Sequence, residues 1–263
     1  MKFALIDGVK SEAFKGDKGF CQSCGAEMIA KCGEFKVNHW AHKKKRQCDT
    51  WWETETEWHR KWKGNFPIKW QEIIQFDSET NEKHIADVRA KNGLVIEFQH
   101  SHINPVERKK REEFYKNLIW IVDGTRLKRD IPRFNKAKKD FVQMFKPKIF
   151  GIEFADECFP KNWLCSSVPV IFDFSGTLLY CIFPVQLGWY TIFAEISRKA
   201  LVKSIIEGIW QTRYENFNKD LIERNELRKQ QEKLELKRRQ DRARYEFNQR
   251  LLGRKYTGGK RRF

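Results

Sequence analysis

A strand–turn–strand pattern constrains this chain most, and it spans residues 84–99, "HIADVRAKNGLVIEFQ". The first part alternates apolar and polar residues, and Asn92-Gly93 is a strong turn signal, so the pattern predicts a β-hairpin. Glu97 and Gln99 project from one face of the second strand, because residues two apart in a strand point the same way. A carboxylate at the end of so apolar a strand is costly unless a cation pairs with it or binds it.

The hairpin predicts an acidic cluster. Asp87 on the first strand and Glu97 on the second reach comparable heights on neighbouring strands. A third carboxylate, Glu55, precedes them on a segment that we expect to be helical. An all-oxygen site of this kind is what Mg²⁺ or Mn²⁺ prefers, and such an ion supports phosphodiester hydrolysis.

The preceding segment, "WWETETEWHRKWKGNF", has helical spacing over residues 51–66. Glu55, His59 and Lys63 lie at i, i+4 and i+8 and share one stripe of the expected helix. A neighbouring apolar stripe is formed by Trp51, Trp58 and Trp62. A solvated charged face is the alternative, and only the downstream carboxylates favour a functional stripe.

A metal-binding pattern occupies the first 50 residues. Cys21 and Cys24 form a Cys-x-x-Cys turn, followed by His39 and His42 in "HWAH" and then by Cys48. Two thiolates from such a turn, with two further ligands downstream, suit a tetrahedral structural Zn²⁺. We expect Cys21, Cys24, His39 and His42 to bind it, with Cys48 as a competing ligand.

The charge of the chain indicates a polyanionic partner. Lysine and arginine exceed aspartate and glutamate by 52 − 35 = 17, and residues 219–263 hold 16 basic against 7 acidic residues. Nucleic acid, and DNA first, is the expected partner. The seven cysteines, the absence of a signal-peptide pattern and the short apolar runs favour a reduced cytoplasmic protein without a membrane span.

Taken together, the motifs between Cys21 and Trp120 resemble those of the competence protein CoiA-like family. The quoted features, in order, are Cys21/Cys24, "HWAH", Glu55/His59, Asp87, "EFQHS", Arg111/Tyr115 and "LIWIVDG". The order of helix Glu, Asp and Glu-x-Lys is also the pattern of the PD-(D/E)xK nucleases. The resemblance implies a restriction-endonuclease-like core, nuclease chemistry and a link with DNA uptake and recombination.

Two residues depart from the broader nuclease pattern. Gln99 stands where the motif lysine would be, and Ala86 precedes Asp87 where proline is usual. Glutamine can position a water or a phosphate but carries no charge. Lys63 or His59 is expected to supply the missing positive charge in the transition state.

Several residues near the motif are candidates for substrate contact. His100 and Ser101 follow the strand directly, and either substrate contact or an ordinary polar loop explains them equally well. Arg108, Arg111 and Tyr115 lie along a helix expected to begin near Pro105. Phosphate contact and a structural salt bridge are both open for the two arginines.

We therefore expect an α/β (α+β) protein with a restriction-endonuclease-like core, an N-terminal zinc knuckle and a long C-terminal basic helical extension. The expected boundaries are 1–50, 51–130, a β-rich region at 131–200, and 201–263, whose helices should end at Gly253. The expected function is metal-dependent DNA cleavage in DNA processing, recombination or mobile-element or antiviral defence. A catalytically weak DNA-binding accessory protein and an RNA-directed nuclease are the alternatives, and docking of a protein partner or a second copy on the C-terminal helices stays open.

Overall fold

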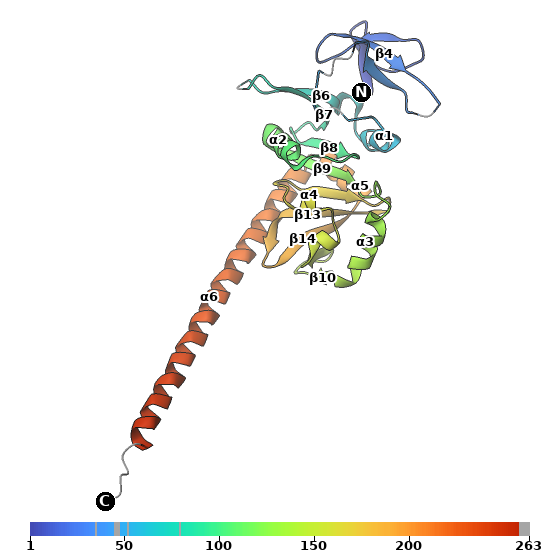
Figure 1. Cartoon of the computed structure of the whole chain (residues 1–263). Coiled ribbons are helices and arrows are strands. Elements are labelled where there is room, and N and C mark those ends of the chain that lie inside the picture. Colours follow the sequence, from blue (N-terminus) through green and yellow to red (C-terminus); the bar gives the residue numbers. More distant parts are fainter. Residues whose placement is uncertain (35, 45–47, 52, 79, 258–263) are drawn as a thin grey trace, which may run out of the picture.

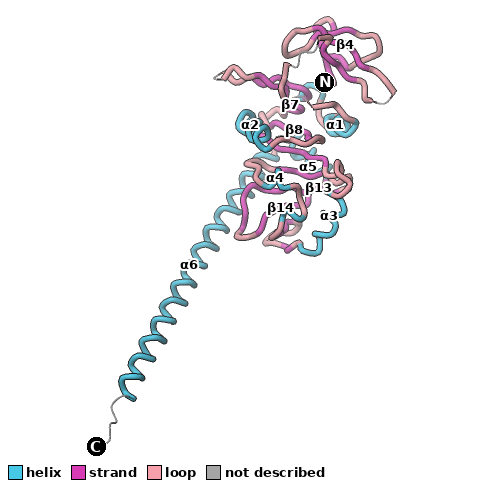
Figure 2. Tube along the Cα trace, viewed as in Figure 1, coloured by secondary structure: helices cyan, strands magenta, loops and turns pink. Residues whose placement is uncertain are grey.

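The computed structural model describes residues 1–257 except 35, 45–47, 52 and 79, with side chains described as far as residue 250. The described strands form a small five-stranded sheet and a nine-stranded sheet, and a single long helix projects from the second (Figure 1). The protein is thus a mixed α/β structure in which helices flank the larger sheet (Figure 2).

The first sheet is antiparallel, in the order β2-β1-β3-β4-β5. Its strands are β1 (Phe3–Ile6), β2 (Val9–Glu12), β3 (Lys18–Phe20), β4 (Glu27–Lys31) and β5 (His39–His42). The buried core of this domain is small and consists of Met1, Ala4, Ala13, Cys21, Met28 and Trp40. A core of this size gives little stability by itself, so the domain needs a further cross-link such as a metal.

The second sheet has the order β10-β11-β14-β13-β12-β9-β8-β7-β6. Its strands are β6 (Gln71–Phe76), β7 (Lys83–Arg89), β8 (Val95–Gln99), β9 (Leu118–Asp123), β10 (Val142–Gln143), β11 (Ile149–Ile152), β12 (Val170–Asp173), β13 (Leu178–Leu187) and β14 (Tyr190–Ser197). Strand β9 runs parallel to both β8 and β12, while the other described pairs are antiparallel. Strands from the expected nuclease core and from the expected β-rich region therefore share one sheet.

Both faces of the sheet are covered because its central strands are apolar on both sides. In β9, Ile119 and Ile121 join one core, and Trp120 and Val122 join the other. The helices are α1 (Glu57–Lys63), α2 (Pro105–Tyr115), α3 (Asp130–Ala137), α4 (Lys161–Leu164), α5 (Arg198–Ile206) and α6 (Trp210–Thr257), with 3₁₀ turns at Ile68–Trp70, Lys138–Asp140 and Ala155–Glu157. Residues of α1, α5 and α6 pack in the first core, and residues of α2, α3 and α4 pack in the second.

Two local expectations are confirmed and one is wrong. The hairpin turns at Gly93, whose φ is +85°, and the helix after β8 begins at Pro105 with Asn104 as its N-cap. The helix expected from Trp51 begins only at Glu57. The side chain of Thr56 accepts a hydrogen bond from the His59 amide and ends the extended segment before it, so Glu55 lies outside the helix.

Helix α6 is longer than expected and stands apart from the rest of the molecule. Its start packs against β13, and the rest of the helix projects away from the other elements (Figure 1). The side chains of residues 229–250 are exposed. The helix continues through Gly253, where we expected it to end, since an isolated glycine weakens a helix without stopping it. Residues 258–263 of the basic tail lie outside the described residues. In the described part of the chain every helix is too short or too polar to cross a bilayer.

Glu72 joins the two sheets. Its buried carboxylate accepts hydrogen bonds from the backbone amides of Lys2, at 2.6 Å, and Phe3, at 3.0 Å. Glu72 adopts a φ of +49°, which is unusual for a side-chain-bearing residue, and the two bonds help to hold it there. Burial would raise the pKa of Glu72, but Lys63, the N-terminal amine and the two amides lower it to about 2.

We predict that Glu72→Gln lowers the free energy of unfolding by about 3 kcal/mol at pH 7, because buried amides and an ammonium lose their anionic partner. The folded pKa of Glu72 lies below its ordinary value of 4.5, so its contribution is full above that pH and falls as the pH drops toward 2. Urea unfolding of both proteins should show a constant difference from pH 8 to 5 and a shrinking one below. Glu82→Gln, at an exposed position, is the matched control.

Candidate active site and metal centre

Four ligand atoms in the first domain converge on one point. Those of Cys21, Cys24, His42 and Cys48 all lie within 4.8 Å of one another. The first two cysteines are brought together by a tight turn, in which Gly25, at φ +68°, donates its amide to the Cys21 carbonyl at 2.8 Å. Three sulfurs and one imidazole nitrogen form a set that fits tetrahedral zinc.

His39 does not belong to this cluster, so the expected ligand set is corrected. His39 and His42 are three residues apart in β5, and an odd separation places side chains on opposite faces of a strand. The Nδ1 atom of His39 lies 2.9 Å from the Val37 carbonyl. Cys48, named above as the competing ligand, takes the fourth place, with its Sγ 3.6 Å from that of Cys21.

This geometry predicts opposite results for two substitutions. Cys48→Ala should abolish stoichiometric zinc and destabilise the first domain, because a structural zinc site closes with four ligands. His39→Ala should retain about one zinc per chain. Metal analysis of the purified proteins, together with thermal unfolding, tests both. Equal zinc loss in the two variants would contradict the assignment.

The acidic centre forms where β7 and β8 separate. The two strands pair at Val88↔Ile96 and Arg89↔Val95. Beyond that point, hydrogen bonds from backbone amides to carboxylate side chains take the place of backbone pairing between the two strands. The Asp87 amide donates to Glu97 Oε1 at 3.1 Å, and the Phe98 amide donates to Asp87 Oδ2 at 3.0 Å. Each carboxylate thus binds the backbone of the opposite strand, which holds the two side by side.

Glu97 is the carboxylate under the greatest electrostatic stress. It is 4% exposed, and burial and the charge of Asp87 raise its pKa to about 8. Arg111 lies 3.2 Å from Glu97 and opposes this shift, but its guanidinium is shared with Glu107. The cations of the site therefore do not hold Glu97 fully ionised at neutral pH.

Lys63 is the buried cation of the centre. Its Nζ lies 2.9 Å from Asp87, 3.1 Å from Glu55 and 3.3 Å from Glu72. Burial alone would lower the pKa of Lys63, but the three carboxylates raise it well above its ordinary value. Lys63 is therefore a fixed positive charge at the end of α1, and Glu55 meets it from the extended segment.

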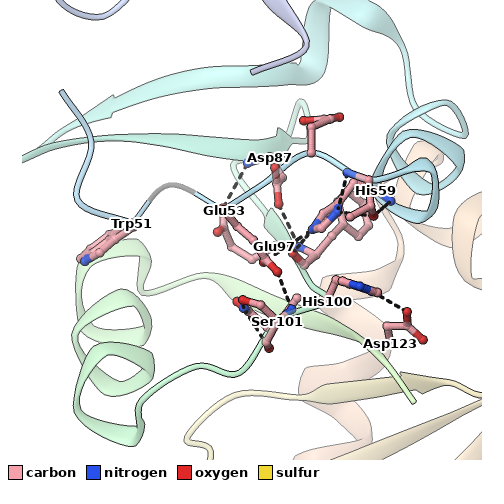
Figure 3. Close-up of polar contacts among 12 residues, drawn as sticks. Trp51, Glu53, His59, Asp87, Glu97, His100, Ser101 and Asp123 are labelled. Carbon is pink, nitrogen blue, oxygen red and sulfur yellow. Dashed lines mark hydrogen bonds and ion pairs between the residues drawn. The ribbon is translucent and has the colours of Figure 1, made fainter. Parts of the chain in front are cut away.

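Glu53 joins the site although the sequence did not single it out. Its carboxylate lies 3.5 Å from His59 Nε2 and accepts a hydrogen bond from the Ser101 amide. Figure 3 shows its side chain beside those of Asp87, Glu97 and His59. Burial would lower the pKa of His59, but the contact with Glu53 and the charge of Asp87 raise it. Glu53 and Glu55 are two residues apart, so their side chains point the same way in an extended segment. Predicting an extended segment here, and not a helix, would have placed both beside the site.

A cavity of about 500 Å³ opens onto these residues. Its acidic wall is formed by Asp49, Glu53, Glu55, Glu72, Asp87 and Glu97, and its lysine and arginine side chains are Lys44, Lys63 and Arg111. Within the described residues, only the Cys/His cluster brings three or more potential ligand atoms within 4.8 Å of one another. The carboxylates are therefore spaced more widely than a closed set of metal ligands.

Three predicted site residues lie at the edge of the centre. The Gln99 amide donates to the Ser101 carbonyl and hydroxyl, so Gln99 orders the loop after β8. His100 Nδ1 lies 2.7 Å from the buried Asp123, and the His100 side chain is 36% exposed (Figure 3). Asp123 was not anticipated, because it ends β9 and meets His100 only through the parallel pairing of β8 and β9.

The arginines of α2 are buried, which favours the structural salt bridge over phosphate contact. Arg108 pairs with Glu112 and donates to the Cys165 carbonyl at 3.0 Å. Arg111 donates to the Trp51 carbonyl at 2.7 Å in addition to its two carboxylates. Tyr115 is only 9% exposed, and burial, followed by the charge of Glu97, raises its pKa well above the ordinary value.

Comparison with known proteins agrees with this architecture. A family model described as "Competence protein CoiA, N-terminal domain" matches residues 8–50, and one described as "Competence protein CoiA, nuclease-like domain" matches residues 72–166. The chain belongs to the CoiA-like family. The first range covers Cys21 to Cys48, the second covers Asp87 to Glu97, and α1 of this CoiA-like protein lies between them.

The competence protein CoiA of Bacillus subtilis (strain 168) is 31% identical over 145 residues, which are 50% of this chain and 38% of that protein. The match thus spans less than two thirds of the relative's length. No solved structure matches the chain.

Proposed function

We propose that the acidic centre is the active site of a PD-(D/E)xK-type nuclease, built on a restriction-endonuclease-like core, that hydrolyses DNA phosphodiester bonds with Mg²⁺ or Mn²⁺. One observation carries the proposal: Asp87 and Glu97 are interlocked at the splayed end of the β7–β8 hairpin, on the wall of a cavity. The match to a nuclease-like domain supports the same chemistry.

The donor set fits a hard divalent cation. Asp87 and Glu97 would ligate it, and Glu55 would complete or orient the site, since its buried Oε1 makes no hydrogen bond within the described residues and lies 3.5 Å from Arg60 Nε. A second positive charge would also relieve the repulsion between Asp87 and Glu97. When bound, the cation would activate water and neutralise charge that develops on the phosphate oxygens.

The remaining roles fall to side chains around the ligands. Lys63 takes the place of the motif lysine and offers positive charge to the phosphate from α1. His59 is oriented by Thr56, whose Oγ1 lies 2.8 Å from its Nδ1. Glu53 is buried, which would raise its pKa, but His59 and the Ser101 amide lower it, so it is ionised and suited to accept a hydrogen bond from the attacking water and orient it. Gln99 positions the loop that carries Ser101.

DNA is the proposed partner on grounds of charge. The formal net charge of +17 favours association with a polyanion, and the exposed α6 extends the basic surface. The family link to competence makes DNA processing or recombination the first setting, with mobile-element or antiviral defence as others. The cytoplasm is the proposed compartment.

We predict that Glu97→Gln abolishes cleavage, by at least about a hundredfold, while DNA affinity stays within about threefold of the parent. The amide keeps the shape of the side chain but cannot ligate the cation as an anion. Gel assays of labelled DNA with Mg²⁺, Mn²⁺ or chelator measure cleavage, and fluorescence anisotropy measures binding. Glu113→Gln, at an exposed position on α2, is the matched control.

Other outcomes would point to other functions. A parent protein that binds DNA but cleaves nothing with any divalent cation would sink the nuclease proposal and favour a binding accessory protein. A parent that cleaves RNA but neither single-stranded nor duplex DNA would favour an RNA-directed nuclease.

A further inference from the structure

The zinc-binding domain forms one wall of the catalytic cavity. Trp40, His42, Lys44 and Cys48 line it from the first domain. Glu53, Glu55, His59, Lys63, Asp87 and Glu97 line it from the second. Two of the zinc-ligating residues, His42 and Cys48, therefore face the same space as the carboxylates. A purely structural appendage would have no need to lie over the site.

This wall is held by buried polar contacts. Glu72 binds two amides of β1 and its extension, as described above. Asp49, next to the ligand Cys48, accepts from the Ile85 amide at 2.8 Å and lies 2.9 Å from His84 Nδ1. Charge-assisted bonds to buried backbone groups are strong. The distance between the two walls is thus set by the fold itself.

Lys44 supplies a positive charge to this wall. It lines the cavity, and within the described residues no carboxylate lies at ion-pair distance from it. Its neighbour Lys43 points elsewhere and pairs with Glu27 at 2.6 Å. An exposed ammonium without an ion pair, on the wall that the first domain contributes to a cavity lined by carboxylates, suits a ligand that places phosphate on one side and its reacting bond on the other.

We propose that the two domains form one substrate site, in which Lys44 binds a backbone phosphate and the fixed gap admits a single DNA strand but excludes a continuous duplex. The proposal rests on the nuclease function argued above. A cavity of about 500 Å³ has the size of a small-molecule pocket and holds one or two nucleotides. Two paired strands with their stacked bases need far more room than this cavity offers, so a continuous duplex could enter it only by losing its pairing.

The first test compares cleavage of two end-free substrates by the full-length protein with Mn²⁺: circular single-stranded DNA and relaxed covalently closed duplex DNA of the same sequence. We expect the single-stranded circle to be cut at least about tenfold faster, since only it can enter the gap unpaired. Equal rates on the two circles would overturn the proposal while leaving the nuclease function intact. No cleavage of either circle, or of linear DNA, would instead overturn the nuclease function.

The second test is binding, which decides the inference even for an inactive protein. With Ca²⁺ in place of Mn²⁺, Lys44→Ala should weaken the affinity for a single-stranded oligonucleotide about three- to tenfold and reduce the salt slope by about 0.7. Lys43→Ala is the matched control and should change neither. Duplex affinity, carried by the basic surface outside the gap, should be unchanged by both. Identical behaviour of the two variants on the single strand would exclude a role for Lys44.

Discussion

The buried ammonium group of Lys63 joins several separate segments of this molecule. It ends α1 and meets carboxylates from three directions: Glu55 from the extended segment, Glu72 from β6 and Asp87 from β7. Because the group is buried, its desolvation is offset only if all three partners are in place. The positions of α1, the hairpin and the first domain, which Glu72 binds, are therefore mutually dependent.

The segment from Cys48 to Glu53 links the metal centre to the acidic centre. Cys48 belongs to the Cys/His cluster, Asp49 binds β7, and the Trp51 ring stacks on His84 with centroids 3.2 Å apart. Glu53 then reaches His59. A metal bound at the cluster would fix the start of this segment, so its stabilising effect would extend to Glu53, the side chain that we propose to orient the attacking water. The proposed structural and catalytic roles are thus not separable by domain in this chain.

The sequence predicted the elements whose signals are local. The Asn92-Gly93 turn, the Pro105 start of α2 and the Cys-x-x-Cys turn all depend on backbone preferences of a few residues. The prediction was wrong where contacts between distant segments determine the local structure. The apolar spacing of Trp51, Trp58 and Trp62 suggested one helix, yet Trp51 packs on His84 and α1 begins at Glu57.

The candidate site residues also fall into those that local sequence signals predict and those that depend on tertiary contacts. Asp87 and Glu97 could be placed from hairpin geometry, and strand alternation alone could have excluded His39 in favour of Cys48. Glu72 could not be found, because its role depends on the amides of a strand about 70 residues earlier. The continuity of the nine-stranded sheet was equally hidden, since the pairing of β9 with β12 joins segments about 50 residues apart.

The charged residues of the chain lie in two separate places, on the long helix α6 and beside the cavity, and they act over different distances. Helix α6 spans 48 residues and is thus roughly 70 Å long, and most of it projects away from α1, β7 and β8, which carry the acidic centre (Figure 1). Charges separated by more than about 8 Å are largely screened at physiological salt, so its outer residues cannot influence the reacting phosphate. They can only raise the rate and affinity of association with a polyanion. The proposed chemistry at the cavity must rely on the few nearby cations, which do not hold Glu97 in its anionic form, and this favours the divalent cation that we propose.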